Sequence, residues 1–179
     1  GINGGSLDDD LLSTNMDANS NLENPKDAGE VFIDSMVESA LLSVEKAIEY
    51  GLAENMMTIS VKMSDIQDMV KCYSMLSEKT SLPLHLWLTE AGWSTKWIVS
   101  SSIALGLLLQ QGIGDTIRVS LSDEPEEEVK VGFEILKSLG VRNRGVKIVS
   151  CPSCARQQFQ VIDLVKKLEN SLEDIINPL

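Results

Sequence analysis

Histidine, cysteine and aromatic residues are scarce in this chain of 179 residues. It contains one histidine, three cysteines and 4% aromatic residues. Because the cysteines are few and odd in number, a disulfide framework is not expected, and a reducing compartment is favoured. We therefore expect a cytoplasmic protein. The same scarcity leaves few candidate ligands for a zinc site.

Long hydrophobic runs and basic character are also lacking. The most apolar run, residues 98–109, includes three serines and is too short to span a bilayer. The first residues have neither the basic region nor the apolar stretch of a secretory signal. The net charge of −12 argues against nucleic acid as the main partner, because a phosphate backbone needs a basic surface. Since the chain does not begin with Met, we expect an internal piece of a longer protein.

What is present is an alternation of short apolar segments and helical patterns. The β-prone segments start ~30 residues apart, which is the length of one βα unit. They are residues 56–62, 84–90, 116–121 and 145–151. Between them, apolar residues recur at helical spacing in residues 65–76, 98–110 and 126–139. Repeated units of this kind predict an α/β fold with a parallel sheet, either open or closed into a barrel.

The remaining segments of the chain add to this prediction. Residues 98–110 are apolar nearly all round, which predicts a helix packed on both sides. Residues 11–29 are rich in Asn, Asp and Ser, which predicts a polar surface loop or insertion. Helices are expected over residues 31–50 and 156–176.

Polar residues stand where the predicted strands end, and in parallel βα folds functional residues gather there. These residues are Asn3, Ser60, Lys62, Thr89, Glu90, Arg118 and Ser120. Two cations with hydroxyls suit an anionic, oxygen-rich ligand such as a phosphate ester. A single carboxylate suits proton transfer to a leaving oxygen. The alternative is that each charge only solvates the rim of the sheet.

Cys151 and Cys154 form a CxxC motif between a predicted strand and a predicted helix. Such a pair fits a thiol redox site, a zinc site or an iron–sulfur cluster, and the last two need ligands from elsewhere. The motif alone does not decide among them. His85 is expected to be a satisfied core or lumen histidine rather than a catalytic base, and Cys72 a small buried hydrophobe.

Several blocks of sequence, taken in order, resemble the bacterial 4-hydroxy-3-methylbut-2-enyl diphosphate synthases. They are residues 1–7, 60–62, 84–86, 88–92, 112–121, 128–139 and 151–157. The blocks GIGDTIRVSL and CPSCARQ are the most specific. The resemblance covers nearly the whole chain outside residues 11–29.

The resemblance implies the C-terminal half of a TIM (β/α) barrel followed by the start of an iron–sulfur domain. Residues 1–144 would be the partial barrel, and residues 145–179 the linker strand, CxxC and first helix of the iron–sulfur domain. The implied reaction is the reductive ring opening and dehydration of 2-C-methyl-D-erythritol 2,4-cyclodiphosphate in isoprenoid biosynthesis. The family uses a [4Fe–4S] cluster, takes electrons from ferredoxin or flavodoxin, and works as a homodimer.

Site residues follow from the resemblance by position. The diphosphate ligands would be Asn3, Lys62, Arg118 and Ser120, the acid Glu90, and the first two cluster ligands Cys151 and Cys154. The remaining cluster ligands of the family correspond to positions after Leu179. We therefore expect that the isolated chain neither assembles a stable cluster nor turns over substrate.

Three tryptophans depart from the family pattern, which usually has glycine at the positions of Trp87 and Trp97 and a small residue at that of Trp93. An indole at position 87 is expected to overpack the lumen, at a cost of ~1–3 kcal/mol unless its neighbours compensate. Two alternative functions stay open: a non-redox phosphate-ester-binding βα-barrel enzyme with an incidental CxxC, and a zinc-stabilised non-catalytic module.

Overall fold

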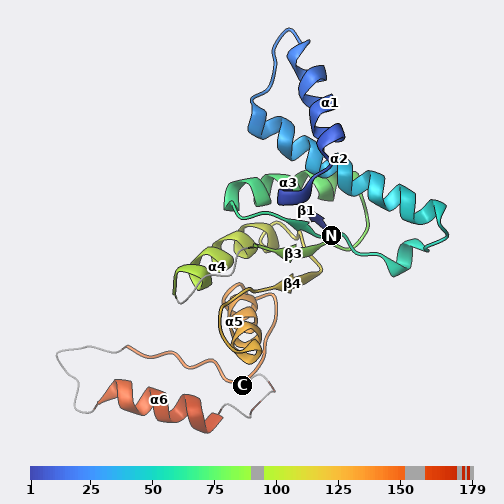
Figure 1. The fold of residues 1–179 in the computed structure, drawn as a ribbon. Helices are drawn as coiled ribbons and strands as arrows, with labels where there is room; N and C mark the ends of the chain where they lie inside the picture. The colour runs from blue at the N-terminus through green and yellow to red at the C-terminus, as the bar shows by residue number, and fades with distance from the viewer. Residues whose placement is uncertain (90–94, 152–159, 173–174, 176, 178–179) are drawn as a thin grey trace. The chain divides into compact units, whose positions relative to one another are not determined.

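The computed structural model describes residues 1–89, 95–151, 160–172, 175 and 177 (Figure 1). The chain divides into two compact units, Gly1–Ile135 and Leu136–Leu179. Unit 1 holds the sheet and most of the helices, and unit 2 holds the last helix. Among the described residues, no helix combines the length and apolar character needed to cross a membrane.

The sheet of unit 1 consists of four short parallel strands. They are β1 (Ile2–Asn3), β2 (Val61–Lys62), β3 (His85–Trp87) and β4 (Thr116–Arg118). β1 pairs with β2 and β3 pairs with β4, while parallel bridges at Ile59–Leu84 and Met63–Leu88 join β2 to β3. The predicted α/β fold with a parallel sheet is confirmed. Within the described residues, the sheet is open and does not close into a barrel.

Helices follow the strands as the periodicity predicts. They are α2 (Ala28–Glu49), α3 (Ile66–Lys79), α4 (Thr95–Leu109) and α5 (Pro125–Ser138) in chain order, with α6 (Val161–Leu172) in unit 2 and short 3-10 turns at Gly4–Ser6 and Glu54–Met56. Side-chain caps fix two of the starts: Asp27 accepts a hydrogen bond from the Glu30 N–H, and Asp65 from the Gln67 and Asp68 N–H groups. These caps satisfy N–H groups that the first turn leaves without partners.

The two faces of the sheet differ in character, because side chains alternate along each strand. Val61 and Leu86 are fully buried on the side that the helices cover. The core on that side is completed by Met36, Val37, Met69, Tyr73, Leu76, Leu105 and Leu108. On the opposite face alternation places Ser60, Lys62, His85, Trp87, Thr116 and Arg118. The apolar core therefore fixes which side chains the strands present on the polar face.

Gly114 shapes the entry into β4. Its φ of +113° lies in a region that side chains disfavour, and a Cβ there would overlap the Leu86 side chain. The next residue, Asp115, accepts a hydrogen bond from the Leu84 N–H through Oδ2 at 2.8 Å. The tight turn thus sets β4 in register beside β3.

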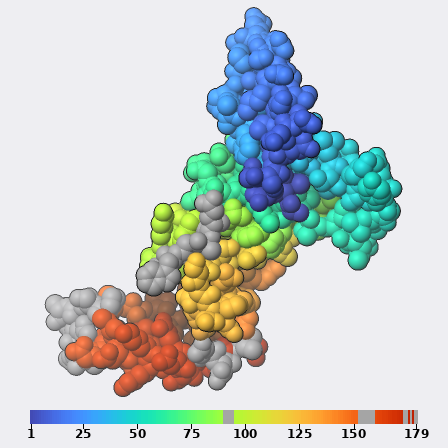
Figure 2. All heavy atoms as spheres, in the orientation of Figure 1, coloured from blue at the N-terminus to red at the C-terminus, as the bar shows by residue number. Residues whose placement is uncertain are grey.

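The predicted loop at residues 11–29 is largely helical, which corrects the sequence interpretation. α1 spans Asp9–Ser20, begins at the Asp8 cap, and has no buried residue. Asn15 Nδ2 on α1 donates to Ser35 Oγ at 3.0 Å and to Glu38 Oε2 at 2.7 Å on α2. In Figure 2 the α1 atoms stand away from those of the sheet region. On the same face of α1, Leu11, Leu12 and Met16 are half-buried. The prediction failed because the many Asn, Asp and Ser residues of this segment outweighed its short apolar stripe.

Two other expectations also need correction. α4 packs on one side only: Ala104, Leu105 and Leu108 are buried, while Val99 and Ile103 are 48% and 47% exposed. Residues 145–151 form no strand, although they read as one. A β-prone run needs a neighbouring strand to complete its backbone hydrogen bonds, and the described residues place none beside it.

Candidate anion-binding site at the strand ends

The carboxyl ends of the four strands bring one row of side chains together. Asn3 is in register with Lys62 across β1 and β2, and Trp87 is in register with Arg118 across β3 and β4. The bridge between Met63 and Leu88, one residue further along, sets Lys62 beside Trp87. Asn3, Lys62 and Arg118, predicted from strand ends far apart in the sequence, therefore belong to one edge of the sheet.

Trp87 lies between the two cations of this row. Lys62 Nζ is 4.8 Å from the centroid of the indole ring, and Arg118 Cζ is 4.2 Å from it. The indole N–H donates to Ser120 Oγ at 2.5 Å. Trp87 is half-buried, so its volume is accommodated by neighbours that contact it favourably. The expected overpacking concerned a closed barrel lumen, and the open sheet of the described residues does not test it.

Neither cation has a carboxylate partner among the described residues. The ion pairs found there are Lys26–Asp34, Lys46–Glu49, Lys71–Glu30 and Lys130–Glu127. In a chain of net charge −12, two cations on either side of one indole ring and without a carboxylate partner form a local electropositive site. Such a site favours an anionic ligand.

Other polar groups at this edge could donate hydrogen bonds to an anion. Asn3 Oδ1 accepts a hydrogen bond from the Gly5 N–H at 3.1 Å, which leaves the amide NH₂ as a donor. Ser120 is buried and accepts from Trp87, so its hydroxyl hydrogen is left to donate. The Ser60 hydroxyl oxygen is buried and makes no hydrogen bond of acceptable geometry among the described residues.

His85 is held by its neighbours. Its Nδ1 is 2.7 Å from Thr116 Oγ1. Burial, together with the charge of Arg118, lowers the pKa of His85 below its usual value of 6.5, so the neutral ring is favoured at neutral pH. Its hydrogen bond to Thr116 agrees with the expectation of a satisfied histidine.

Tyr73 is a supporting residue that sequence reasoning missed. From α3, its hydroxyl accepts from the Val61 N–H at 2.9 Å and donates to the His85 carbonyl at 2.6 Å. Burial raises the pKa of Tyr73 to about 12, so the phenol stays protonated. The phenol links β2 to β3 beneath Lys62 and Trp87. Nothing in the sequence distinguishes it from the other apolar residues on its helical stripe.

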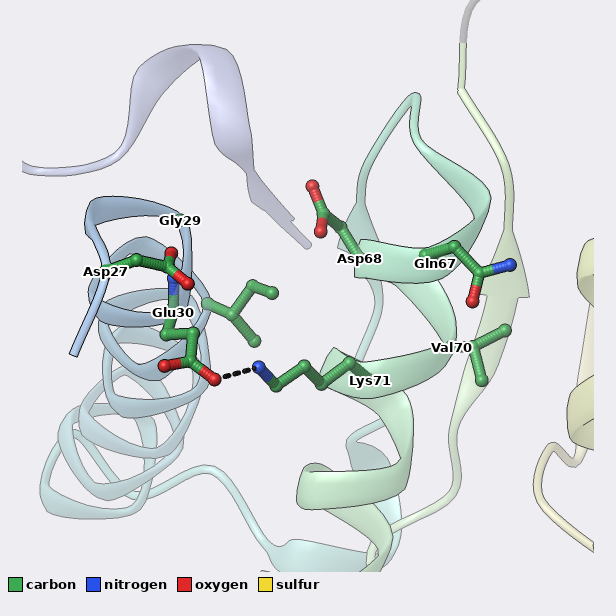
Figure 3. Close-up of a pocket in the computed structure, with 8 residues that line it drawn as sticks. Asp27, Gly29, Glu30, Gln67, Asp68, Val70 and Lys71 are labelled. Atoms are coloured by element: carbon green, nitrogen blue, oxygen red, sulfur yellow. Dashed lines mark hydrogen bonds and ion pairs between the residues drawn. The ribbon is translucent and has the colours of Figure 1, made fainter.

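A second concave site is a groove of about 370 Å³ between the start of α2 and α3. Its lining includes three carboxylates, from Asp27, Glu30 and Asp68, and one lysine, Lys71 (Figure 3). Lys71 Nζ lies 2.9 Å from Glu30 Oε1, and this hydrogen bond raises the pKa of Lys71. Because its only cation is already paired, the groove does not suit an anion.

Comparison with known proteins decides the family. The sequence model of the GcpE TIM-barrel domain matches residues 1–133. The chain belongs to the GcpE TIM-barrel family. It is 52% identical over all 179 residues to a protein of Hyphomonas neptunium named 4-hydroxy-3-methylbut-2-en-1-yl diphosphate synthase (flavodoxin), and covers 43% of that protein. Proteins with the same name from Idiomarina loihiensis and Acidithiobacillus ferrooxidans are each 46% identical, and the chain covers 44% and 45% of them.

The chain thus spans less than half the length of these relatives. The resemblance seen in the sequence is confirmed at the level of the family. Of the predicted site residues, the structure brings Lys62, Arg118 and Ser120 together around Trp87, with Asn3 in the same row. Glu90 and Cys154 lie outside the described residues.

Of the two cysteines that the GcpE resemblance assigns to a cluster, only Cys151 lies within the described residues. Cys151 is exposed. Cys72 is fully buried in unit 1, and burial, with a smaller effect of Asp68, raises the pKa of its thiol to about 12, which disfavours the thiolate that metal binding needs. Across the described ranges, no group of three or more His, Cys, Asp or Glu side chains could hold a metal ion.

Proposed function

We propose that this chain is part of a 4-hydroxy-3-methylbut-2-enyl diphosphate synthase and that its strand ends supply part of the site for the substrate diphosphate. The observation that carries the proposal is the pair of cations, Lys62 and Arg118, on either side of Trp87 at the strand ends and without carboxylate partners among the described residues. Membership of the GcpE family and the names of the relatives support it.

In this proposal the chain is the C-terminal half of a TIM barrel with the start of an iron–sulfur domain. β1 to β4 would then be the last four strands of the barrel, and their polar face would line its lumen. The open sheet supports this assignment, because a half-barrel has unpaired edges. The boundary after residue 144 stays a prediction.

The whole enzyme would reductively open and dehydrate 2-C-methyl-D-erythritol 2,4-cyclodiphosphate. Lys62 and Arg118 would bind the phosphate oxygens, with the Asn3 amide and the Ser120 hydroxyl as further donors. Glu90 would give a proton to the leaving hydroxyl. Charge neutralisation by the two cations would hold the diphosphate while the ring opens.

Electrons for this reaction would come from a [4Fe–4S] cluster, for which Cys151 and Cys154 would be two ligands. By the family resemblance, the other ligands would correspond to positions after Leu179. Three expectations belong to the same proposal: flavodoxin or ferredoxin as electron donor, assembly as a homodimer, and a cytoplasmic location. The relatives named above carry flavodoxin in their names.

Calorimetric titration of the chain with pyrophosphate tests the binding site. Lys62→Met and Arg118→Met should each weaken pyrophosphate binding about tenfold or more, because each removes a charge-assisted hydrogen bond. Lys71→Met is the matched control: it removes an ammonium that is paired in the acidic groove, and should leave binding unchanged. The proposal fails if the unaltered chain does not bind pyrophosphate, or if all three variants behave alike.

A further inference from the structure

We infer that Trp87 is a positioning residue, which fixes Lys62 and Arg118 as a paired cation site selective for a two-phosphate anion over a single phosphate. This inference rests on the proposed diphosphate site and deepens it. It starts from the contact of one indole with two cations from the neighbouring strands on either side, at 4.8 Å and 4.2 Å from its centroid. Trp87 is itself held by its N–H bond to Ser120 Oγ.

The contact with the ring leaves the cations able to bind an anion. A cation above an aromatic face interacts with the π-electrons through its own face or one side. The N–H donors of a stacked guanidinium lie in its plane and point outward, and an ammonium carries three donors in different directions. The indole and a phosphate therefore use different parts of Arg118 and Lys62, so both can be bound at once.

The ring also offsets the electrostatic repulsion that destabilises two cations held in one site. Two positive charges, one from each strand that flanks β3, repel each other. Long Lys and Arg side chains also lose rotamer freedom when they are held in one geometry. The negative quadrupole of the indole face attracts both charges. In the absence of any carboxylate partner in the described part of the chain, Trp87 is the group that restrains them.

The bond to Ser120 fixes the ring without using the donor that an anion needs. Ser120 Oγ accepts from the indole N–H, so its own hydrogen can still point at a phosphate oxygen. A mobile ring would carry the two cations with it. The anchored ring instead holds one cation from each flanking strand, so each of the two phosphate groups of a diphosphate can meet one cation.

The test compares pyrophosphate and inorganic phosphate binding by calorimetry in the 179-residue chain and two variants. Trp87→Leu removes the π-face but keeps apolar bulk, and should weaken pyrophosphate binding about fivefold to twentyfold because two cation–π contacts are lost. Phosphate binding should fall less, so the preference for pyrophosphate shrinks. Trp87→Phe keeps a π-face without the N–H bond, and should restore part of the affinity and of the preference.

Three outcomes separate this inference from the proposed function. If Lys62→Met and Arg118→Met lose pyrophosphate binding while Trp87→Leu binds it equally well or more tightly, the ring is neutral or blocks the site, and the inference is wrong. A preference that is unchanged in Trp87→Leu also overturns it. If the unaltered chain binds no pyrophosphate, the proposed function fails first. Thermal unfolding of each variant checks that it is folded. If Trp87→Leu does not fold, the unaltered chain is compared with Trp87→Phe, which is the smaller change.

Discussion

Units 1 and 2 differ in how much apolar surface each of them buries within itself. All residues that are buried in the described part of the chain, from Val31 to Ile135, belong to unit 1. Unit 2 has an amphipathic helix, α6, but no buried residue among those described. On α6, Ile162, Leu164 and Leu168 are 54%, 43% and 40% exposed.

The difference shows which part of the chain carries its own stability. In unit 1 four strands and the helices that cover them remove a continuous apolar layer from water, and this burial is the main favourable contribution to folding. α6 has the periodicity of a packed helix, but none of its residues is buried among those described. We therefore expect the strand-end site to be held by unit 1 itself.

Cysteine alkylation should give the largest contrast between the units. Burial raises the pKa of Cys72 from 9.0 to about 12, so its thiolate is roughly a thousandfold rarer at a given pH, whereas Cys151 is exposed. After reduction, iodoacetamide should modify the tryptic peptide with Cys151 and spare Cys72, as mass spectrometry would show. In denaturant both should react. Fast native labelling of Cys72 would mean that the core of unit 1 opens freely.

Truncation of a leucine in each unit should give the next largest effect. Leu86 is fully buried against Gly114, and Leu168 is 40% exposed. Leu86→Ala should lower the free energy of unfolding by about 2–5 kcal/mol, whereas Leu168→Ala should change it by about 0.5 kcal/mol or less. Urea unfolding followed by circular dichroism measures both. Equal losses would show that α6 packs as tightly as the sheet.

Removal of one hydroxyl should have a smaller effect within unit 1. Tyr73→Phe leaves the Val61 N–H without its acceptor and the His85 carbonyl without its donor. The free energy of unfolding should fall by about 1–3 kcal/mol, as measured by urea unfolding. Tyr50→Phe is the control, because Tyr50 is 82% exposed and should show no change. A loss from Tyr73→Phe no larger than in this control would mean that the phenol does not hold β2 and β3 together.

Much of unit 1 could be predicted from the sequence. Burial repeats with the period of each element, so α2 to α5 were found within a few residues of their bounds. Parallel strands place their carboxyl ends on one edge, so Asn3, Lys62 and Arg118 could be assigned to one row before any coordinates. The predictions failed for α1, where the polar composition hid a short apolar stripe, and for residues 145–151, which pair with no strand among the described residues.

The sequence by itself determined the family, because several blocks of it, taken in order, resemble one family. It also determined the alternation of strands and helices over most of unit 1 and the charged residues at the strand ends, because these depend on local periodicity. Tertiary structure decided what Trp87 does. By sequence its bulk predicted strain, since only its own strand could be considered. In the fold, Lys62 comes from the strand on one side and Arg118 from the strand on the other. Contacts between strands are set by the shared core beneath them, which no single segment contains.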